Sequence, residues 1–329
     1  MTSFPTHNHT TVIDVILALV GIALVLYGAD KFTDGSVALA RRFSISELVI
    51  GLTVVAFGTS LPEFVVSLMA SIEGSAPLSV GNIVGSNLFN TMMIVGVTAS
   101  IAPIAVRKST IFKDIPFSLL ASVILAALAL DHILDGGGAA DRLSRGDGIA
   151  LLGFFCVFMA YTFAIAKPRP GQTPSAPAEL FPLWKMVLFM VGGLVGLVLG
   201  GELFVRGASG VARSLGVSEA VIGLTLVAGG TSLPELATSV ISARKGQSGI
   251  AIGNVIGSNL FNIFWILGFC STITPMPIEG MTPWDFLTLM GSGLLFLLFA
   301  RTDHRVVRWE GLTLVACYFA YLAWLIIQL

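Results

Sequence analysis

The sequence predicts an all-α integral membrane protein with ten transmembrane helices, arranged as two five-helix repeats of inverted topology. Three observations lead to this fold class. Of the 329 residues, 55% are hydrophobic and only 11% are charged, compared with roughly 25% charged in typical soluble domains. Ten apolar segments are long enough to cross a bilayer, which takes about 20 residues each. One stretch of 41 residues occurs twice. The composition excludes a disordered chain, a nucleic-acid binder and a secreted disulfide scaffold.

The predicted spans follow one another with short polar connections. They are 11–29, 45–72, 78–102, 115–131, 148–166, 183–203, 217–243, 250–273, 283–300 and 310–328. The first is interpreted as a retained span and not as a signal peptide, because residues 1–10 carry no Lys or Arg and no small-residue cleavage site follows. The connections 132–147 and 167–182 are the longest, and neither is large enough for a soluble domain.

The distribution of Lys and Arg predicts the orientation of the chain. The connections after spans 1, 3, 5, 7 and 9 hold 14 of the 18 basic residues, and the opposite side holds only Arg142, Arg145, Arg206 and Arg213. Cytoplasmic loops are enriched in positive charge, so both termini are expected outside. We therefore expect a multi-pass protein of a prokaryotic inner membrane, with lipid as its surroundings and no obligatory protein partner.

The duplicated stretch defines the repeats. Residues 50–90 align without a gap to 222–262 at a constant offset of 172, and 22 of the 41 positions are identical. The first repeat comprises 11–131 with 148–166, the second comprises 183–328, and 167–182 is a cytoplasmic linker. Five spans per repeat place the second copy upside down relative to the first. Transporters use inverted repeats to build one midplane site that opens to either side.

Two carboxylates lie deep within the predicted spans, Glu63 in the second and Glu235 in the seventh. Glu63 follows Glu47 by 16 residues, or about 24 Å of helix. An ionised group at the bilayer centre costs about 2.5–3.5 kcal/mol, so a functional site is favoured over a protonated or paired Glu that only joins helices. The prolines before them, Pro62 and Pro234, lack an N–H and free the carbonyl one turn back.

The side chains around both carboxylates are oxygen donors. Asn82 and Asn254 head two polar stripes and can also simply bond helices together. The candidate site residues are Thr59, Ser60, Glu63, Ser86 and Asn90 in the first repeat, and Thr231, Ser232, Glu235, Ser258 and Asn262 in the second. Such groups suit hard cations such as Ca²⁺ and Na⁺, and Mg²⁺ less well because it gives up water reluctantly. Two ionised glutamates neutralise one Ca²⁺. The three cysteines lie in apolar runs without metal or disulfide spacing, and no cofactor is expected.

These motifs resemble the cation/calcium exchanger superfamily. GTSLPE at 58–63 and 230–235, each followed by GNxxGSNLFN at 81–90 and 253–262, is similar to the paired alpha-repeats of its prokaryotic sodium/calcium exchanger branch. The resemblance implies a core of spans 2, 3, 7 and 8, with spans 1 and 6 moving across it. It also adds the backbone of Ala56 and Ala228 to the ligands, and it suggests three Na⁺ exchanged per Ca²⁺. Some members carry an acidic residue at the position of Asn90 or Asn262. This chain has an amide at both, which leaves stoichiometry and potassium dependence open.

The leading interpretation is therefore a secondary antiporter that exchanges Na⁺ for Ca²⁺ by alternating access. A Ca²⁺/H⁺ antiporter would use the same two glutamates with protons as the coupling ion. A passive channel would contain the same ligands, and single-channel current steps would identify it. An intramembrane enzyme would need a nucleophile and base pair, and the sequence shows none, so no enzyme is expected.

Overall fold

The computed structural model describes residues 7–134, 141–166, 181–217, 222 and 228–328, which are almost wholly helical. In this part of the chain, eight helices are long and apolar enough to cross a membrane, and a bent pair of helices at 47–72 makes a ninth. The all-helical membrane fold is thereby confirmed. The seventh predicted span, 217–243, is described continuously only from residue 228, and most of the linker 167–182 lies outside the described residues.

The elements follow in chain order, with π-helical segments labelled η. The first half contains α1 (His7–Arg42), α2 (Glu47–Ile50), η1 (Gly51–Val55), α3 (Ala56–Thr59), α4 (Leu61–Ile72), α5 (Ala76–Leu88), η2 (Phe89–Ile94), α6 (Val95–Ile101), β1 (Ile104–Ala105), η3 (Thr110–Asp114), α7 (Ile115–Ala129), α8 (Asp131–Leu134), β2 (Arg142–Leu143) and α9 (Arg145–Ala164). The second half contains α10 (Leu183–Ser214), α12 (Ala228–Thr231), α13 (Leu233–Arg244), α14 (Ser248–Leu260), η5 (Phe261–Leu267), α15 (Gly268–Ile273), β3 (Met276–Pro277), α16 (Pro283–Thr302), β4 (Arg305–Val306) and α17 (Arg308–Gln328). The short strands pair antiparallel, β1 with β4 and β2 with β3.

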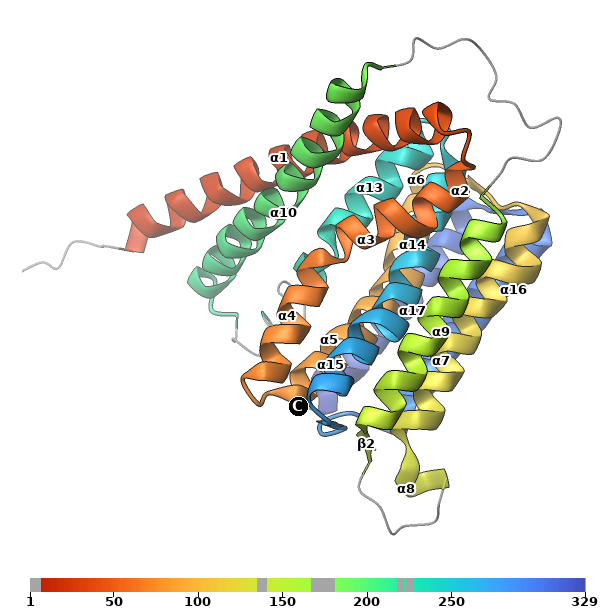
Figure 1. Ribbon diagram of the computed structural model, residues 1–329. Coiled ribbons are helices and arrows are strands. Elements are labelled where there is room, and N and C mark those ends of the chain that lie inside the picture. The colour runs from red at the N-terminus through yellow and green to blue at the C-terminus, as the bar shows by residue number, and fades with distance from the viewer. Residues whose placement is uncertain (1–6, 135–140, 167–180, 218–221, 223–227, 329) are drawn as a thin grey trace, which may run out of the picture.

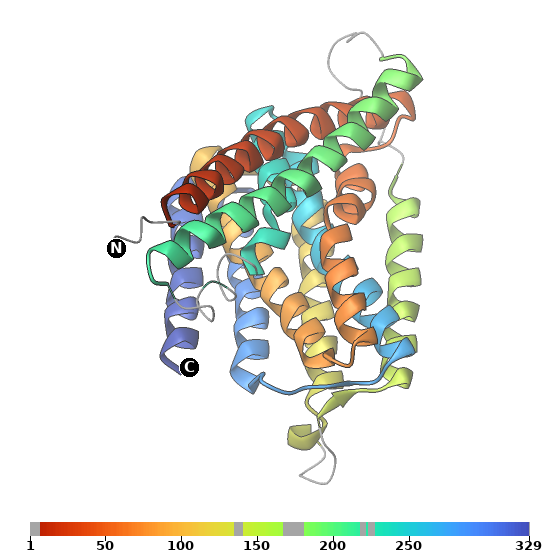
Figure 2. The same ribbon diagram turned by 90° about the vertical axis from the view of Figure 1, so that its left-hand side faces the viewer.

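Helices α1 and α10 lie side by side and slant across the other helices, as both ribbon views show (Figures 1 and 2). They have 36 and 32 residues, or about 54 and 48 Å at 1.5 Å per residue. Both are longer than the roughly 30 Å hydrocarbon core and must tilt to fit. The predicted ends at 29 and 203 were therefore too early. Helix α1 continues through Asp30 and Lys31, which form an ion pair at 2.9 Å.

Glycines form the seam between α1 and α10. Gly21, Gly28 and Gly35 recur every seven residues in α1, as do Gly193, Gly200 and Gly207 in α10. The backbones touch at these glycines: a Cβ added at Gly28 would lie 2.7 Å from the carbonyl oxygen of Gly193, and one added at Gly193 would lie 2.8 Å from that of Gly28. At these glycines the two helices pack backbone to backbone, which favours their moving as one body.

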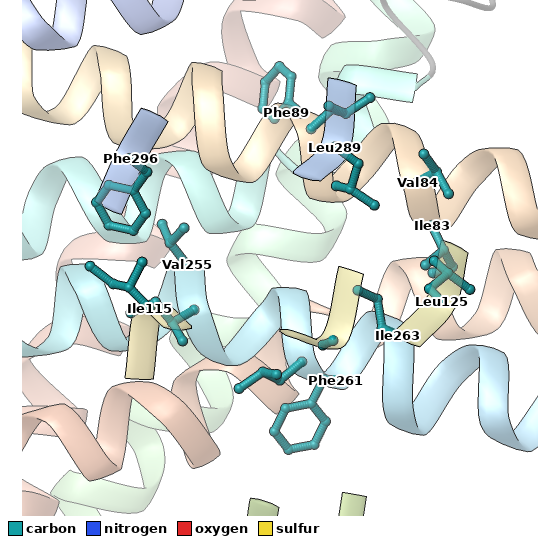
Figure 3. Packing of buried hydrophobic residues seen from close by; sticks show 14 of the residues in the cluster. Ile83, Val84, Phe89, Ile115, Leu125, Val255, Phe261, Ile263, Leu289 and Phe296 are labelled. Atoms are coloured by element: carbon teal, nitrogen blue, oxygen red, sulfur yellow. The ribbon is translucent and has the colours of Figure 1, made fainter. Parts of the chain in front are cut away.

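The core is built around the two helical segments that carry the polar stripes, 76–101 and 248–273. In the second segment, 94% of an apolar stretch of 18 residues is buried. Figure 3 shows the apolar part of this core, in which Val84, Val255 and Phe261 lie among side chains from α7 and α16. Because apolar neighbours enclose these segments on several sides, their amides and hydroxyls face protein and not lipid.

Carboxylates near several helix ends act as caps. Asp147 and Asp285 complete capping boxes with Ser144 and Thr282 at the starts of α9 and α16. Glu310 accepts a hydrogen bond from the backbone N–H of Val307 at 2.8 Å, before α17. These groups satisfy N–H donors that have no partner within the helix, so Asp285 and Glu310 have a structural role at the helix ends.

Candidate functional site

Each copy of the duplicated GTSLPE sequence breaks its helix shortly before the glutamate. Helix α3 ends at Thr59, Ser60 leaves the helical region with φ −84° and ψ 6°, and α4 starts at Leu61 after a bend of 48°. Ser232 has nearly the same geometry, with φ −92° and ψ 8°, between α12 and α13. Pro62 provides the reason, since it cannot donate to the preceding turn. The break places each carboxylate in the first turn of a helix, where the helix dipole favours negative charge.

The two glutamates are held by serines from opposite repeats. The Ser60 hydroxyl donates to Glu235 Oε1 at 3.0 Å, and the Ser232 hydroxyl donates to Glu63 Oε1 at 3.0 Å. Both glutamates are buried, with relative exposures of 0% and 1%. The Ser86 hydroxyl lies 3.4 Å from Glu63 Oε1 and 2.9 Å from the Ser232 hydroxyl. This exchange of donors makes one shared cluster, to which both repeats contribute equally.

A layer of buried amides continues the cluster and shows the same reciprocity. Asn90 donates through Nδ2 to Asn259 Oδ1 at 3.1 Å, and Asn262 donates through Nδ2 to Asn87 Oδ1 at 2.9 Å. Asn259 in turn donates to the hydroxyl of Thr91 at 2.9 Å. The sequence analysis missed Asn87 and Asn259. Their signal was present, because both belong to the duplicated GSNLFN motif one position after the serines that were chosen.

Several buried acceptor oxygens in this cluster have no hydrogen-bond donor. They are Oε2 of Glu63 and of Glu235, Oδ1 of Asn90 and of Asn262, and the hydroxyl oxygen of Ser258. The first four form two pairs related by the repeat offset. Buried polar atoms without partners are rare and costly. Four unpartnered acceptors, two of them on carboxylates, form an environment that a desolvated cation would satisfy.

The remaining predicted residues lie at the edge of this cluster. The Thr59 hydroxyl donates to the carbonyl of Val55 and to Asn254 Oδ1, both at 3.1 Å. The carbonyl of Ala56 accepts the N–H of Ser60 at 3.0 Å, which leaves its second lone pair for another partner. Thr231 ends α12, which begins at Ala228.

The first polar residue of each stripe joins neighbouring helices. Asn254 donates to the Ser239 hydroxyl at 3.0 Å, and Asn82 donates to the equivalent Ser67 at 3.1 Å. Both bonds tie a core helix to the helix that carries the glutamate. The structural interpretation of these two asparagines is therefore confirmed.

A cavity of about 630 Å³ adjoins the cluster between α4 and α10. Its lining includes Thr231 and the prolines of both helix breaks, Pro62 and Pro234, together with Glu202 and Arg206 of α10. The wall is mostly apolar, and the charged pair is its most polar part. The cavity thus provides space between the candidate site and one end of the α1–α10 pair.

Comparison with known proteins identifies the family. The family described as sodium/calcium exchanger protein matches residues 13–164 and 185–327. The chain belongs to the sodium/calcium exchanger family. The matched ranges cover both halves of this exchanger, and the match makes it a multi-pass transporter of ions across a membrane.

Relatives of this exchanger extend over nearly its full length. A putative antiporter, CaxA of Alkalimonas amylolytica, is 37% identical over 93% of this chain and 96% of its own. The sodium/calcium exchanger MaX1 of Methanosarcina acetivorans is 31% identical over 94% and 97%. The structure of the sodium-calcium exchanger NCX_Mj soaked without Na⁺ and Ca²⁺ superposes with a TM-score of 0.81 at 35% identity, covering 96% of this chain and 99% of that one.

Proposed function

We propose that this chain is a secondary antiporter that exchanges Na⁺ for Ca²⁺ by alternating access, with both ions bound between the two repeats. The observation that carries the proposal is the set of unpartnered acceptors on Glu63, Glu235, Asn90 and Asn262. These groups are buried, they are oxygens, and they come in pairs related by the repeat. A site of this kind neutralises two positive charges.

The chemistry of the cluster favours Ca²⁺ and Na⁺ among the common cations. All of the nearby ligands are oxygens, from two carboxylates, four or more hydroxyls, amides and helix-break carbonyls. Ca²⁺ accepts six to eight such ligands in flexible geometry, whereas Mg²⁺ demands a tight octahedron. The name of MaX1, a sodium/calcium exchanger, supports the same pair of ions for this chain.

The ligand set that we propose joins both repeats. It consists of the carbonyls of Ala56 and Ala228 with the side chains of Thr59, Ser60, Glu63, Ser86, Asn90, Thr231, Ser232, Glu235, Ser258 and Asn262. The reciprocal bonds of Ser60 and Ser232 support this set, because the two hydroxyls already lie at the opposite carboxylates. Hydroxyls rotate, so they can donate to a carboxylate in one state and turn a lone pair toward a cation in another.

The architecture that we propose is ten spans in two inverted halves, an arrangement suited to alternating access, and several pairs of elements support it. Helices α4 and α13 both have 12 residues, α5 and α14 both have 13, and each pair starts at positions 172 apart. With the basic residues inside, both termini face outward. The 630 Å³ cavity between α4 and α10 then opens on the outer side of the site.

The test is calcium-45 uptake into proteoliposomes with imposed ion gradients. Vesicles loaded with Na⁺ and diluted into Na⁺-free medium should accumulate calcium, and vesicles with only a pH gradient should accumulate little. Robust uptake driven by the pH gradient and indifferent to Na⁺ would overturn the proposed coupling in favour of Ca²⁺/H⁺ exchange. Current steps typical of a pore would overturn exchange itself.

A further inference from the structure

A charged contact joins α1 to the end of α13. The Lys245 ammonium lies 2.7 Å from Asp30 Oδ1 and 2.7 Å from Asp34 Oδ1, and it also donates to the backbone carbonyl of Asp30 at 3.1 Å. Next to it, the hydroxyls of Thr33 and Ser242 are 3.1 Å apart and buried. We call Asp30, Asp34 and Lys245 the inner latch, since this end carries most of the basic residues. It links the slanting helix pair to the core.

The repeat offset of 172 residues identifies the counterparts of these residues in the other half. The turn after α4 and the turn after α13 have the same form, since Gly74 and Gly246, which are 172 apart, have φ of 79° and 77°. These left-handed angles are suited to glycine. Glu73 is therefore the counterpart of Lys245. On the slanting pair, Glu202 corresponds to Asp30 and Arg206 to Asp34.

Two of the three counterparts have the opposite charge: Glu73 corresponds to Lys245, and Arg206 corresponds to Asp34. In the inner latch, the base lies on the core and the acid Asp34 lies on the slanting helix. At the other end, the acid Glu73 lies on the core and the base Arg206 lies on the slanting helix. Each end thus has two acids around a base that can bridge the core and the slanting helix, and at the inner end Lys31 is a second base, paired with Asp30 at 2.9 Å. In the part of the chain that the structure describes, Arg206 pairs with Glu202 one turn away on α10 and makes no ion pair with Glu73.

The two ends of the slanting pair also differ in packing. The space between α4 and α10, on the Arg206 side, is the cavity of about 630 Å³. A smaller cavity of about 290 Å³ between α1 and α13 is lined by apolar side chains such as Leu26, Leu233 and Phe204, and no residue of the inner latch lines it. The ion pairs of the inner latch are thus formed, whereas Glu202 and Arg206 at the other end line a cavity. If the repeats exchange conformations, the end with this cavity must close on its own counterpart contacts.

We propose that Arg206 and Glu73 form an outer latch, with Glu202 as second acid, that closes the outer end when the Asp34–Lys245 contact opens. This inference rests on the alternating access proposed above and adds the residues that balance its two states. Partly exposed ion pairs contribute at most about 1 kcal/mol. Each latch therefore biases the equilibrium without locking it, which transport requires.

The test is disulfide cross-linking in a variant with Cys156, Cys270 and Cys317 replaced by alanine. The pair Asp34→Cys with Lys245→Cys should cross-link rapidly, and the pair Arg206→Cys with Glu73→Cys should cross-link more slowly, as read by mass spectrometry of the linked peptides. The pair Arg206→Cys with Lys245→Cys, at opposite ends, serves as the negative control. An outer pair that stays as unreactive as this control would overturn the proposal.

Coupling between the latches gives a second readout. In the outer cysteine pair, adding Lys245→Gln should raise the cross-linking rate about two- to fivefold, because the inner contact no longer opposes closure of the outer end. Arg244→Gln, which removes the neighbouring charge at the end of α13, should leave the rate unchanged. Equal rates in both variants would contradict the coupling. Because cross-linking needs no ion flux, it separates failure of the latch from failure of Na⁺/Ca²⁺ exchange.

If the cysteine variants fold poorly, exchanging the charges of Arg206 and Glu73 tests the same proposal without introduced cysteines. Arg206→Glu should slow calcium exchange about fivefold, since three acids then face one another. Adding Glu73→Arg should restore the rate to within about twofold of the parent. A double variant as slow as Arg206→Glu alone would count against the outer latch.

Discussion

At the scale of single residues, the site consists of two buried carboxylates that share their hydrogen-bond donors across the repeats. Each glutamate has one oxygen bonded to the serine of the other repeat and one oxygen with no donor. A buried charge of −2 without compensation is strongly unfavourable. The serines orient the carboxylates, and in the function proposed here a bound cation supplies the missing positive charge.

Replacing either glutamate should therefore abolish transport without unfolding the protein. Glu63→Gln and Glu235→Gln each remove one of the two charges that balance Ca²⁺ while keeping the side-chain size. Loss of one partner of a buried charge pair costs about 3 kcal/mol or more, or at least a hundredfold in affinity. Calcium flux should fall below detection while gel filtration still gives a single symmetric peak. Near-normal flux in either variant would refute the shared site.

The crossed serines should contribute equally. Ser60→Ala and Ser232→Ala each remove a hydroxyl donor to the opposite carboxylate, and such bonds are worth about 1.5–3 kcal/mol. We expect the calcium concentration for half-maximal flux to shift by roughly tenfold or more in both. Ser122→Ala is the matched control, because this hydroxyl bonds only its own helix at Ser118. A shift in one serine variant alone would show that the two halves are not equivalent in binding.

Duplication led the sequence analysis to the glutamates, the serines and Asn90 and Asn262, and the structure brings these side chains into one buried cluster. The sequence was insufficient for Asn87 and Asn259. These lie one residue after the chosen serines, and only the structure shows that their amides face the stripe of the other repeat. Spacing along one helix indicates which residues share a face. It does not indicate which face meets the partner helix.

At the scale of elements, two local features position the site: the helix breaks at Ser60 and Ser232 and the glycine seam between α1 and α10. The breaks were predictable from Pro62 and Pro234, since proline has one dominant effect in a helix. The lengths of α1 and α10 could not be predicted in the same way. Hydropathy falls at Asp30, but the helix continues because charged side chains there find partners in Lys31 and Lys245.

The seam predicts a contrast between adjacent glycines of α10. In Gly193→Ala, the new Cβ would lie 2.6 Å from the backbone nitrogen of Phe32 in α1, whereas in Gly192→Ala it meets nothing within 4 Å. Overpacking costs about 1–3 kcal/mol, while alanine in a free helical position gains up to about 1 kcal/mol. The first variant should melt several degrees lower than the parent in detergent, and the second should melt at or above it. Equal melting temperatures would contradict the close α1–α10 contact.

At the scale of the whole molecule, the two halves are related by the offset of 172, and the crossed bonds of Ser60 and Ser232 and of Asn90 and Asn262 occur in two versions. Composition predicted the membrane class, and the repeat predicted the pairing of elements, because both are properties of long stretches. The mutual packing of distant helices was not predictable, since it depends on close approaches such as that of Gly96 to Gly311, where a Cβ added at Gly96 would lie 2.7 Å from the carbonyl oxygen of Gly311.

The topology predicts opposite labelling of two exposed positions at the two ends. In the background without native cysteines, Lys108→Cys should react with a membrane-impermeant maleimide only from the cytoplasm, and Glu279→Cys only from outside. Both side chains are exposed, so access to the reagent depends on the membrane alone. Labelling of both from the same side would break the span count on which the inverted repeat depends.

The central claim is that one site with a charge of −2 exchanges several Na⁺ for one Ca²⁺, so that charge moves in every cycle. The most direct measurement is calcium uptake into Na⁺-loaded proteoliposomes whose membrane potential is clamped with valinomycin and potassium. With three Na⁺ leaving for each Ca²⁺ entering, one positive charge moves outward, and 100 mV is worth about 2.3 kcal/mol per charge. Uptake should rise when the interior is made positive and fall when it is made negative. Uptake that ignores the potential, or that proceeds without Na⁺ inside, would contradict the account.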